Sequence, residues 1–302
     1  MSPGEAAAGP RQPEVSVVMP VYNGARYVGV AIESVLEQTF HDFELVVVND
    51  ASTDDSAAVI ATFNDPRIRA YDNAQNLGMT GNWNRSVSLA RGRYVTMLHQ
   101  DDQMLPDNLS RKLEILRGGS GRWVASDCFQ IGSAGEVLHE HWFRHRQASA
   151  FARYGRFVQF MGMFFGDNYL CFTTLMWDRA LMAHSGPFTD AGRYCADVHM
   201  WLKMLYREPI VYLNERLVRY RWAQNLSLRY DEDKWDIADF LARQAAAEDL
   251  SLPWPYRALL RLQYGGRFLF RVAGHALHRR VERRNASYEG LRLVLSATRP
   301  SR

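Results

Sequence analysis

The sequence predicts an α/β fold in which a mostly parallel central sheet is flanked by helices. Short β-branched runs alternate with amphipathic helical segments between residues 15 and 117, and this alternation is typical of parallel sheets. Of the 302 residues, 47% are hydrophobic and 23% are charged, as in a globular protein with a sizeable core. Polar residues directly follow several expected strands, which is where such sheets bind ligands.

The expected elements follow one another along the chain. The first strand is the apolar run 15–19, which ends before Pro20, and apolar residues at helical spacing predict a helix over 25–38. The other expected elements are a strand at 44–48, a helix over 54–63 capped by Ser52 or Thr53, a strand at 68–71, a helix over 80–91, a strand at 94–98, a helix over 106–117, a strand at 123–131, a turn at 133–136, a loop at 139–150, a strand at 172–177 and a helix over 196–206.

Polar residues gather at the ends of three of these strands. Tyr22 and Asn23 follow the first strand, Asp50 follows the second, and Asp101 with Asp102 follows the fourth. Because ligands bind beyond the carboxyl ends of the strands in such sheets, we expect these side chains to line one crevice.

The adjacent carboxylates are the sharpest chemical signal. Asp101 and Asp102 repel one another unless a cation or strong donors compensate, and their oxygens suit Mg²⁺ or Mn²⁺ bridging to substrate phosphates. A solvated acidic turn is the alternative. Asp50 can bind a base edge or a ribose hydroxyl, or serve as a turn residue. The segment 76–82 can bring backbone N–H groups to a phosphate, or form a simple turn.

Together these segments resemble the opening of the family 2 glycosyltransferases, which have the GT-A fold. The resemblance is nearly continuous from 15 to 110 and thinner from 170 to 222. Asp101 and Asp102 stand in the place of the family's DXD-type metal motif. The segments that carry the resemblance are 15–23, 31–39, 43–54, 76–84, 90–95 and 98–106.

The resemblance implies a role for each matching residue. Asp50 would bind the base, Asp101 would lie near the ribose and pyrophosphate, and Asp102 would ligate the Mg²⁺ or Mn²⁺ that holds the diphosphate. The residues implied in binding the nucleotide sugar are Pro20, Val21, Tyr22, Asn23, Asp50, Gly78, Asn82 and Asp101.

An inverting transfer also needs a general base, which in the family is the Asp of a Glu-Asp pair opening a helix. Asp197 falls on that position, with Ala196 in place of the Glu. The alternative for Asp197 is a carboxylate favoured by the helix dipole. Ala51 and Gln100 also depart from the family pattern, and the run 220–227 lacks the family's His. The chain has no signature of the processive synthases, so we expect single addition.

The net charge of +3 is unevenly spread, because from Trp254 onward there are eleven arginines, no lysine and two glutamates. This tail fits an anionic membrane surface, or a helix packed on the catalytic domain with its arginine face in water. We expect no nucleic-acid partner, because no reading module accompanies the charge. Helical spacing places Arg257, Arg261, Arg271, His275 and Arg279 on one side, and Leu259, Leu262, Leu269, Phe270, Ala273 and Leu277 on the other.

We expect a disordered leader at 1–13, a GT-A catalytic domain at 14–225 and a helical basic extension at 226–302. Within the domain, 14–118 would bind the nucleotide sugar and 119–225 would face the acceptor. The leader lacks the apolar core of a signal peptide, and the spacing of the three cysteines fits neither a zinc site nor a disulfide framework. We therefore expect a cytoplasmic protein, peripheral on the membrane. We expect His139, His141 and His145 in a solvated or acceptor-facing loop rather than a metal cluster.

The leading hypothesis is an inverting, metal-dependent transferase that moves a sugar from a nucleoside-diphosphate sugar, uridine by family habit, to a hydroxyl of a glycan or lipid-linked acceptor. A nucleotidyltransferase is one alternative, although the chain lacks a glycine-rich, lysine-containing loop after the first strand. A non-catalytic nucleotide-sugar-binding module is the other, and Ala196 keeps it open.

Overall fold

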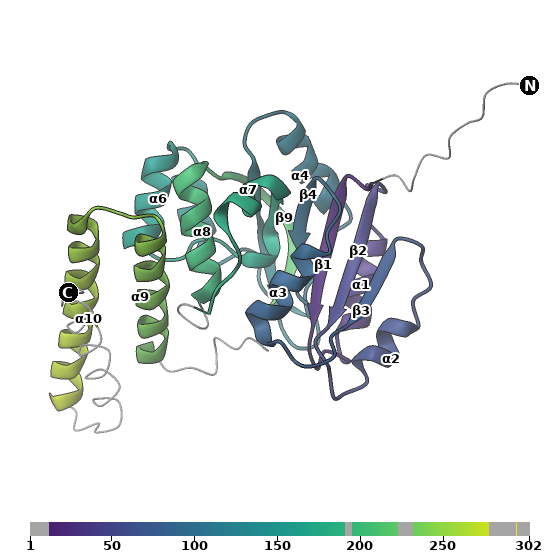
Figure 1. Ribbon diagram of the computed structural model, residues 1–302, viewed down its shortest axis with the longest axis horizontal. Coiled ribbons are helices and arrows are strands. Elements are labelled where there is room, and N and C mark those ends of the chain that lie inside the picture. Colours follow the sequence, from purple (N-terminus) through teal and green to yellow (C-terminus); the bar gives the residue numbers. More distant parts are fainter. Residues whose placement is uncertain (1–11, 191–194, 223–231, 278–293, 295–302) are drawn as a thin grey trace, which may run out of the picture.

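The computed structural model describes residues 12–190, 195–222, 232–277 and 294 (Figure 1). The side chains of 232, 233, 268 and 270–277 lie outside this description. Most of the expected leader therefore lies outside the described residues, as does Arg279.

One mixed sheet runs through the molecule, in the order β3-β2-β1-β4-β8-β6-β9-β5, with β7 paired to β6. The first four strands in this order are parallel, which confirms the predicted parallel half. In the second half β8 is antiparallel to both neighbours, while β6 and β9 are parallel. The strands are β1 (Val15–Val21), β2 (Phe43–Asn49), β3 (Ile68–Asp72), β4 (Tyr94–Met97), β5 (Gln103–Met104), β6 (Trp123–Ile131), β7 (Val137–His139), β8 (Leu175–Asp178) and β9 (Val211–Arg221).

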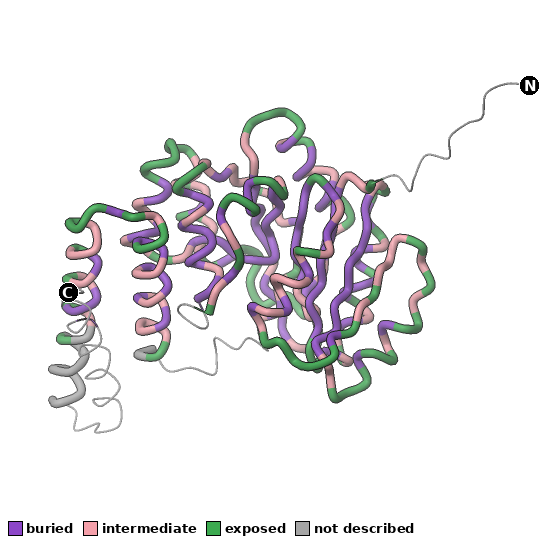
Figure 2. The backbone as a smooth tube through the Cα atoms, in the orientation of Figure 1, coloured by how far each residue is buried: buried purple, intermediate pink, exposed green. Residues whose placement is uncertain are grey.

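Helices cover both faces of the sheet, so every residue of β1 and β2 is buried (Figure 2). Alternate residues of a strand face opposite sides. Val17 accordingly packs in one core with α1 and α4, whereas Val18 packs in the other with α6 and α8. The helices are α1 (Val28–Leu36), α2 (Ser56–Ala61), α3 (Gly78–Ser88), α4 (Asn108–Arg117), α5 (His145–Phe151), α6 (Arg156–Phe165), α7 (Arg179–Ser185), α8 (Ala196–Arg207), α9 (Glu232–Asp249) and α10 (Trp254–Leu277), with a 3₁₀ turn at Phe172–Thr174.

Two local predictions are wrong. The expected loop at 139–150 contains the start of α5, whose single buried residue, Ala148, gives little amphipathic pattern. The side chains of Ser52 and Thr53 do not cap α2, because its N-cap residue is Asp55. The Ser52 hydroxyl instead accepts the backbone N–H of Asn23 at 3.0 Å, which ties the turn after β2 to the end of β1.

The C-terminal helices stack beyond α8, with α9 against α8 and α10 against α9 (Figure 1). Leu260 and Tyr264 of α10 are buried in this contact. Arg267 Nη1 lies 3.7 Å from Asp236 Oδ1 of α9. The helix continues through the glycine pair at 265–266.

The predicted apolar side of α10 is not the side that packs. Leu259, Leu262 and Leu269 are 53%, 72% and 56% exposed. The alternative of a helix packed on the domain is confirmed in its packing, through Leu260 and Tyr264, but leucines as well as arginines of the described part of α10 meet the solvent. Five other residues of the predicted helix sides have side chains outside the described set: Arg271, His275, Phe270, Ala273 and Leu277.

The turn after β2 places a strain on Ala51, whose φ of 53° lies in the left-handed region. That conformation costs a non-glycine residue roughly 1–2 kcal/mol. Glycine avoids this cost, but it lowers the free energy of unfolding by roughly 0.4–1 kcal/mol because the unfolded chain gains conformational entropy. We expect Ala51→Gly to raise the free energy of unfolding by about 0.5–1 kcal/mol in urea titrations. The exposed Ala58→Gly in α2 is the control and should lower it by up to about 1 kcal/mol. Equal destabilisation by both changes would contradict the prediction.

Candidate functional site

The ends of β1, β2 and β4 are joined by direct hydrogen bonds, as the predicted crevice requires. The backbone N–H of Tyr22 donates to Gln100 Oε1 at 2.7 Å, and Gln100 Nε2 donates to the Tyr22 carbonyl at 3.0 Å. The backbone N–H of Thr53 donates to Asn23 Oδ1 at 2.8 Å. The residues after β1 therefore contact those after both of its neighbours in the sheet.

Asp50 is buried within a network of amides. Its Oδ1 accepts the side-chain amide of Asn73 at 2.5 Å and the backbone N–H of Leu77 at 2.8 Å. Leu77 is the N-cap residue of α3. Asn73 also donates to Asn82 Oδ1 at 3.2 Å, and Asn82 donates to the Val48 carbonyl at 3.1 Å. Asp50 and Asn82 thus meet through Asn73, a residue that the sequence analysis did not select.

The other predicted residues at this edge offer mainly backbone groups. The side chains of Pro20 and Val21 are buried in β1, whereas Tyr22 and Asn23 are exposed beyond it. Gly78 begins α3 at a φ of +74°, and the space beside its Cα, where a side chain would project, is open. A ligand at this edge would therefore meet the backbone of β1 and the start of α3.

The carboxylate pair follows β4. Asp102 is 1% exposed, and its Oδ1 accepts the backbone N–H of Arg221 at 2.8 Å. Its buried Oδ2 makes no well-formed hydrogen bond among the described residues, although the Thr173 hydroxyl is near enough to favour the charged form of the carboxylate. Burial and the neighbouring charge of Asp101 raise the pKa of Asp102 well above its usual range, and burial raises the pKa of Asp101.

An unpartnered carboxylate oxygen beside a second carboxylate fits a hard divalent cation, which takes oxygen ligands. Such a cation would remove the repulsion that makes two neighbouring carboxylates costly. Asp102 would supply the buried oxygen, while Asp101, which is partly exposed, lies on the side open to solvent. The residues present therefore fit Mg²⁺ or Mn²⁺.

Arg221 of β9 contacts both residues of the carboxylate pair. Its Nε donates to the Asp101 carbonyl at 2.9 Å, and its guanidinium also donates to the Gly132 carbonyl. The guanidinium carbon lies 4.3 Å from the ring centroid of Tyr27. The sequence analysis considered the run 220–227 only for its missing His, so it did not identify Arg221 as the residue that joins the pair to the second half of the sheet.

His99 lies beside the pair but does not neutralise it. Its Nδ1 is 3.8 Å from Asp102 Oδ2, and its ring stacks on Trp83 with centroids 5.7 Å apart. Burial lowers the pKa of His99 to about 4, so the ring is neutral at neutral pH.

Asp197 lies in the first turn of α8. Asn168 Nδ2 donates to its Oδ2 at 2.9 Å, and burial raises the pKa of Asp197 to about 6. Asn168 is four residues before Phe172, whose ring centroid is 5.0 Å from that of His99. The segment 168–172 therefore links Asp197 to the surroundings of the carboxylate pair. Ala196, at the position of the family's Glu, is fully buried in the core.

The chain is similar to known proteins along most of its length. The profile of glycosyl transferase family 2 matches residues 16–172, more than half of the 302 residues. The chain is 26% identical to the Escherichia coli enzyme WfgD, a UDP-Glc:α-D-GlcNAc-diphosphoundecaprenol β-1,3-glucosyltransferase, over 77% of this chain and 88% of WfgD.

Solved structures show the same fold. Staphylococcus aureus TarS 1–349 in complex with UDP-GlcNAc gives a TM-score of 0.68 at 16% identity, covering 95% of this chain and 82% of TarS 1–349. The Pyrobaculum calidifontis mannosyltransferase PcManGT in complex with GDP-Man and Mn²⁺ gives a TM-score of 0.56 at 17% identity, covering 96% of this chain and 77% of that one. The GT-A fold predicted from the sequence is confirmed.

The burial of Asp102 predicts a trade between stability and metal binding. Because its folded pKa is raised, the charged form destabilises the native state at neutral pH, and this cost falls as the pH is lowered. In EDTA we expect Asp102→Asn to melt higher than wild type by roughly 2–4 °C, since the amide Oδ1 still accepts the N–H of Arg221. Excess Mn²⁺ should raise the melting temperature of wild type but not of the variant.

Asp167→Asn, at an exposed carboxylate paired with Arg144, is the control for this experiment and should behave as wild type. A lower melting temperature of Asp102→Asn in EDTA, or an equal gain from Mn²⁺ in all three proteins, would contradict the prediction.

Proposed function

The chain belongs to glycosyl transferase family 2, and we propose that it adds a single sugar, with inversion, to a hydroxyl of a glycan or lipid-linked acceptor. Family membership makes it a glycosyltransferase that uses a nucleotide-sugar donor, rather than a nucleotidyltransferase or a non-catalytic module. The observation that carries the proposed mechanism is the unpartnered, buried oxygen of Asp102 at the sheet edge that also bears Asp50.

The donor would lie across this edge. Asp50, fixed by Asn73 and the N–H of Leu77, would bind the base, and the backbone of Pro20, Val21, Tyr22 and Asn23 would line the same pocket. Gly78 and Asn82 would border it from α3, and Asp101 would face the ribose and pyrophosphate. Asp102 would hold Mg²⁺ or Mn²⁺, whose charge stabilises the nucleoside diphosphate as it leaves.

Asp197 would be the general base. The acceptor oxygen forms a bond to the anomeric carbon, the bond from that carbon to the diphosphate oxygen breaks, and the hydroxyl proton passes to Asp197. A carboxylate with a pKa of about 6 is a stronger base than an ordinary Asp yet is still ionised at neutral pH. The amide of Asn168 would hold this carboxylate in place.

The relatives support the finer choice of substrates. WfgD takes UDP-Glc and acts on a diphosphoundecaprenol-linked sugar, and TarS was solved with UDP-GlcNAc. Both favour a uridine donor, and WfgD favours a lipid-linked acceptor. PcManGT was solved with GDP-Man and Mn²⁺, so a guanosine donor belongs in any test.

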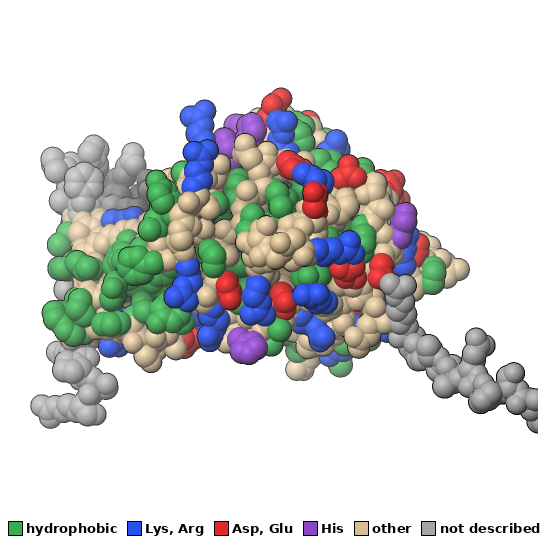
Figure 3. Space-filling view, turned by 90° about the horizontal axis from the view of Figure 1, so that it is seen from above, with side chains coloured by type: hydrophobic (Ala, Val, Ile, Leu, Met, Phe, Trp, Pro, Cys, Tyr) green, Lys and Arg blue, Asp and Glu red, His purple; other side chains and the backbone are tan. Residues whose placement is uncertain are grey.

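The C-terminal helices support contact with an anionic membrane surface. Hydrophobic side chains gather at this end of the molecule (Figure 3), and they include the outward-facing Trp254, Leu259, Leu262 and Leu269 of α10. The arginine-rich composition from Trp254 onward complements anionic headgroups. No helix in the described ranges is both long and apolar enough to cross a membrane. A peripheral position on the cytoplasmic face, without nucleic acid, remains the prediction.

Asp197→Asn tests the proposed chemistry. With UDP, dTDP, GDP and CMP, each in Mn²⁺, Mg²⁺ or EDTA, we expect one nucleoside diphosphate to raise the melting temperature in a metal-dependent way, equally in wild type and variant. Only wild type should transfer sugar from the matching donor, and its rate should fall below about pH 6, where Asp197 is protonated. Asp102→Ala, as the control, should lose the shift itself. Transfer by Asp197→Asn at the wild-type rate would refute the role of the base.

Leu262→Glu tests the membrane contact. Burying one leucine contributes about 1.5–3 kcal/mol, so we expect the variant to bind phosphatidylglycerol vesicles at least about tenfold more weakly than wild type in co-sedimentation. Val30→Glu, at an exposed apolar residue of α1, is the matched control and should bind as wild type. Equal binding of wild type to phosphatidylglycerol and phosphatidylcholine vesicles would count against an anionic surface.

A further inference from the structure

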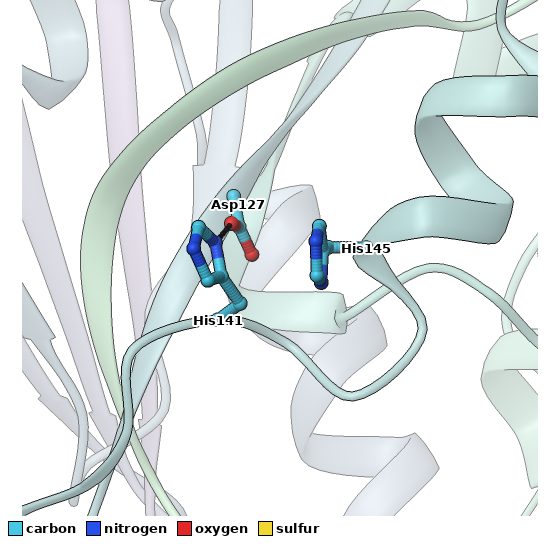
Figure 4. Close-up of side chains that lie close together, drawn as sticks. All are labelled: Asp127, His141 and His145. Atoms are coloured by element: carbon cyan, nitrogen blue, oxygen red, sulfur yellow. Dashed lines mark hydrogen bonds and ion pairs between the residues drawn. The ribbon is translucent and has the colours of Figure 1, made fainter.

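Three potential metal ligands meet outside the carboxylate pair. Asp127 comes from β6, His141 from the segment after β7, and His145 from the first turn of α5 (Figure 4). One ligand atom from each lies within 4.8 Å of the other two. The sequence analysis expected a solvated loop here, because nothing in the local sequence places Asp127 beside these histidines.

Asp127 is the buried member of the group. It is 1% exposed, and its Oδ1 accepts the backbone N–H groups of Cys128 at 2.8 Å and Trp142 at 2.9 Å. Its Oδ2 lies 2.5 Å from His141 Nδ1. The carboxylate thus fixes both the backbone that carries His141 and the orientation of its ring.

The hydrogen bonds define the tautomer of both rings. His145 Nδ1 lies 2.9 Å from the carbonyl oxygen of Trp142, which can only accept, so this nitrogen carries the proton. His141 Nδ1 faces a carboxylate and is the donor by the same argument. In the neutral tautomer of each ring, the free lone pair is therefore on Nε2. Histidines that bind metals almost always donate their other ring N–H to a carboxylate or a backbone carbonyl, which is the pattern found here.

The two rings also lie against each other near the surface. They stack with centroids 4.4 Å apart and planes at 23°, and 45% of the His141 side chain is exposed. The group borders a pocket of about 670 Å³ lined by Trp142, Phe143, Trp222 and Arg146.

We propose that His141 and His145 bind a borderline divalent transition metal of the Zn²⁺ class through Nε2, with Asp127 orienting His141 and offsetting the charge. Imidazole ligands suit Zn²⁺ and its neighbours, whereas oxygen-only sites suit Mg²⁺. Because both histidines line the pocket, water or an oxygen of a ligand in the pocket could complete the coordination. This site does not depend on the proposed transfer reaction.

Co²⁺ absorption and Zn²⁺ calorimetry on the full chain, with excess Mg²⁺ present to compete at the carboxylate pair, test the site. We expect one saturable Co²⁺ site with a visible absorption band in wild type and in Asp102→Ala. His141→Ala and His145→Ala should bind at least tenfold more weakly, and Asp127→Asn roughly 10–100-fold more weakly. His139→Ala is the matched control, since His139 ends β7 and lines the same pocket but does not belong to the group of three ligands.

Melting temperatures in EDTA verify that each variant is folded, and His145→Gln replaces His145→Ala if the latter unfolds. Absence of saturable Co²⁺ binding in wild type would overturn the proposal. So would undiminished binding in the folded His141 and His145 variants, or an equal loss in His139→Ala.

Discussion

The cost of burying carboxylates at the end of a parallel sheet governs this structure. Asp50 and Asp102 are both nearly inaccessible to water, and a buried charge must be paired or hydrogen-bonded. The chain meets this requirement differently at the two places. Asp50 accepts donors from Asn73 and the start of α3, whereas Asp102 keeps one oxygen without a partner. One carboxylate is therefore held by the protein alone, and the other would be completed by the proposed cation.

The parallel half of the fold could be predicted because its information is local. The β-branched runs of β1 and β2 are buried on both faces, so they appear as largely apolar stretches, and β6 was expected at its observed bounds. The second half was harder. β9 has mixed burial along its length without a regular alternation. The exposed side of α6 carries the apolar residues Phe157 and Val158, so its two sides are hard to tell apart in the sequence.

The residues of the candidate site likewise divide into those that could be selected from the sequence and those that could not. Asp50, Asp101 and Asp102 could be selected from the sequence because each follows an expected strand, and Asp197 was selected through the resemblance to the family. Their partners could not, because Asn73, Asn168 and Arg221 are ordinary polar residues until the fold brings them together. Asp127 and its two histidines show the same limit, since 14 residues separate Asp127 from His141. The predicted division into leader, domain and extension remains a prediction.

The bond from the backbone of Arg221 to Asp102 spans 119 residues of sequence. Loop closure over such a distance is among the slow events of folding, whereas β1, β2 and β3 pair with neighbours close along the chain. The two ends of the proposed donor site are therefore expected to form at different stages of folding. The Asp50 network lies within the first half of the chain and can form early, but the environment of Asp102 is complete only after β9 has joined the sheet. A chain emerging during synthesis would acquire its base-binding surface well before its metal-binding one.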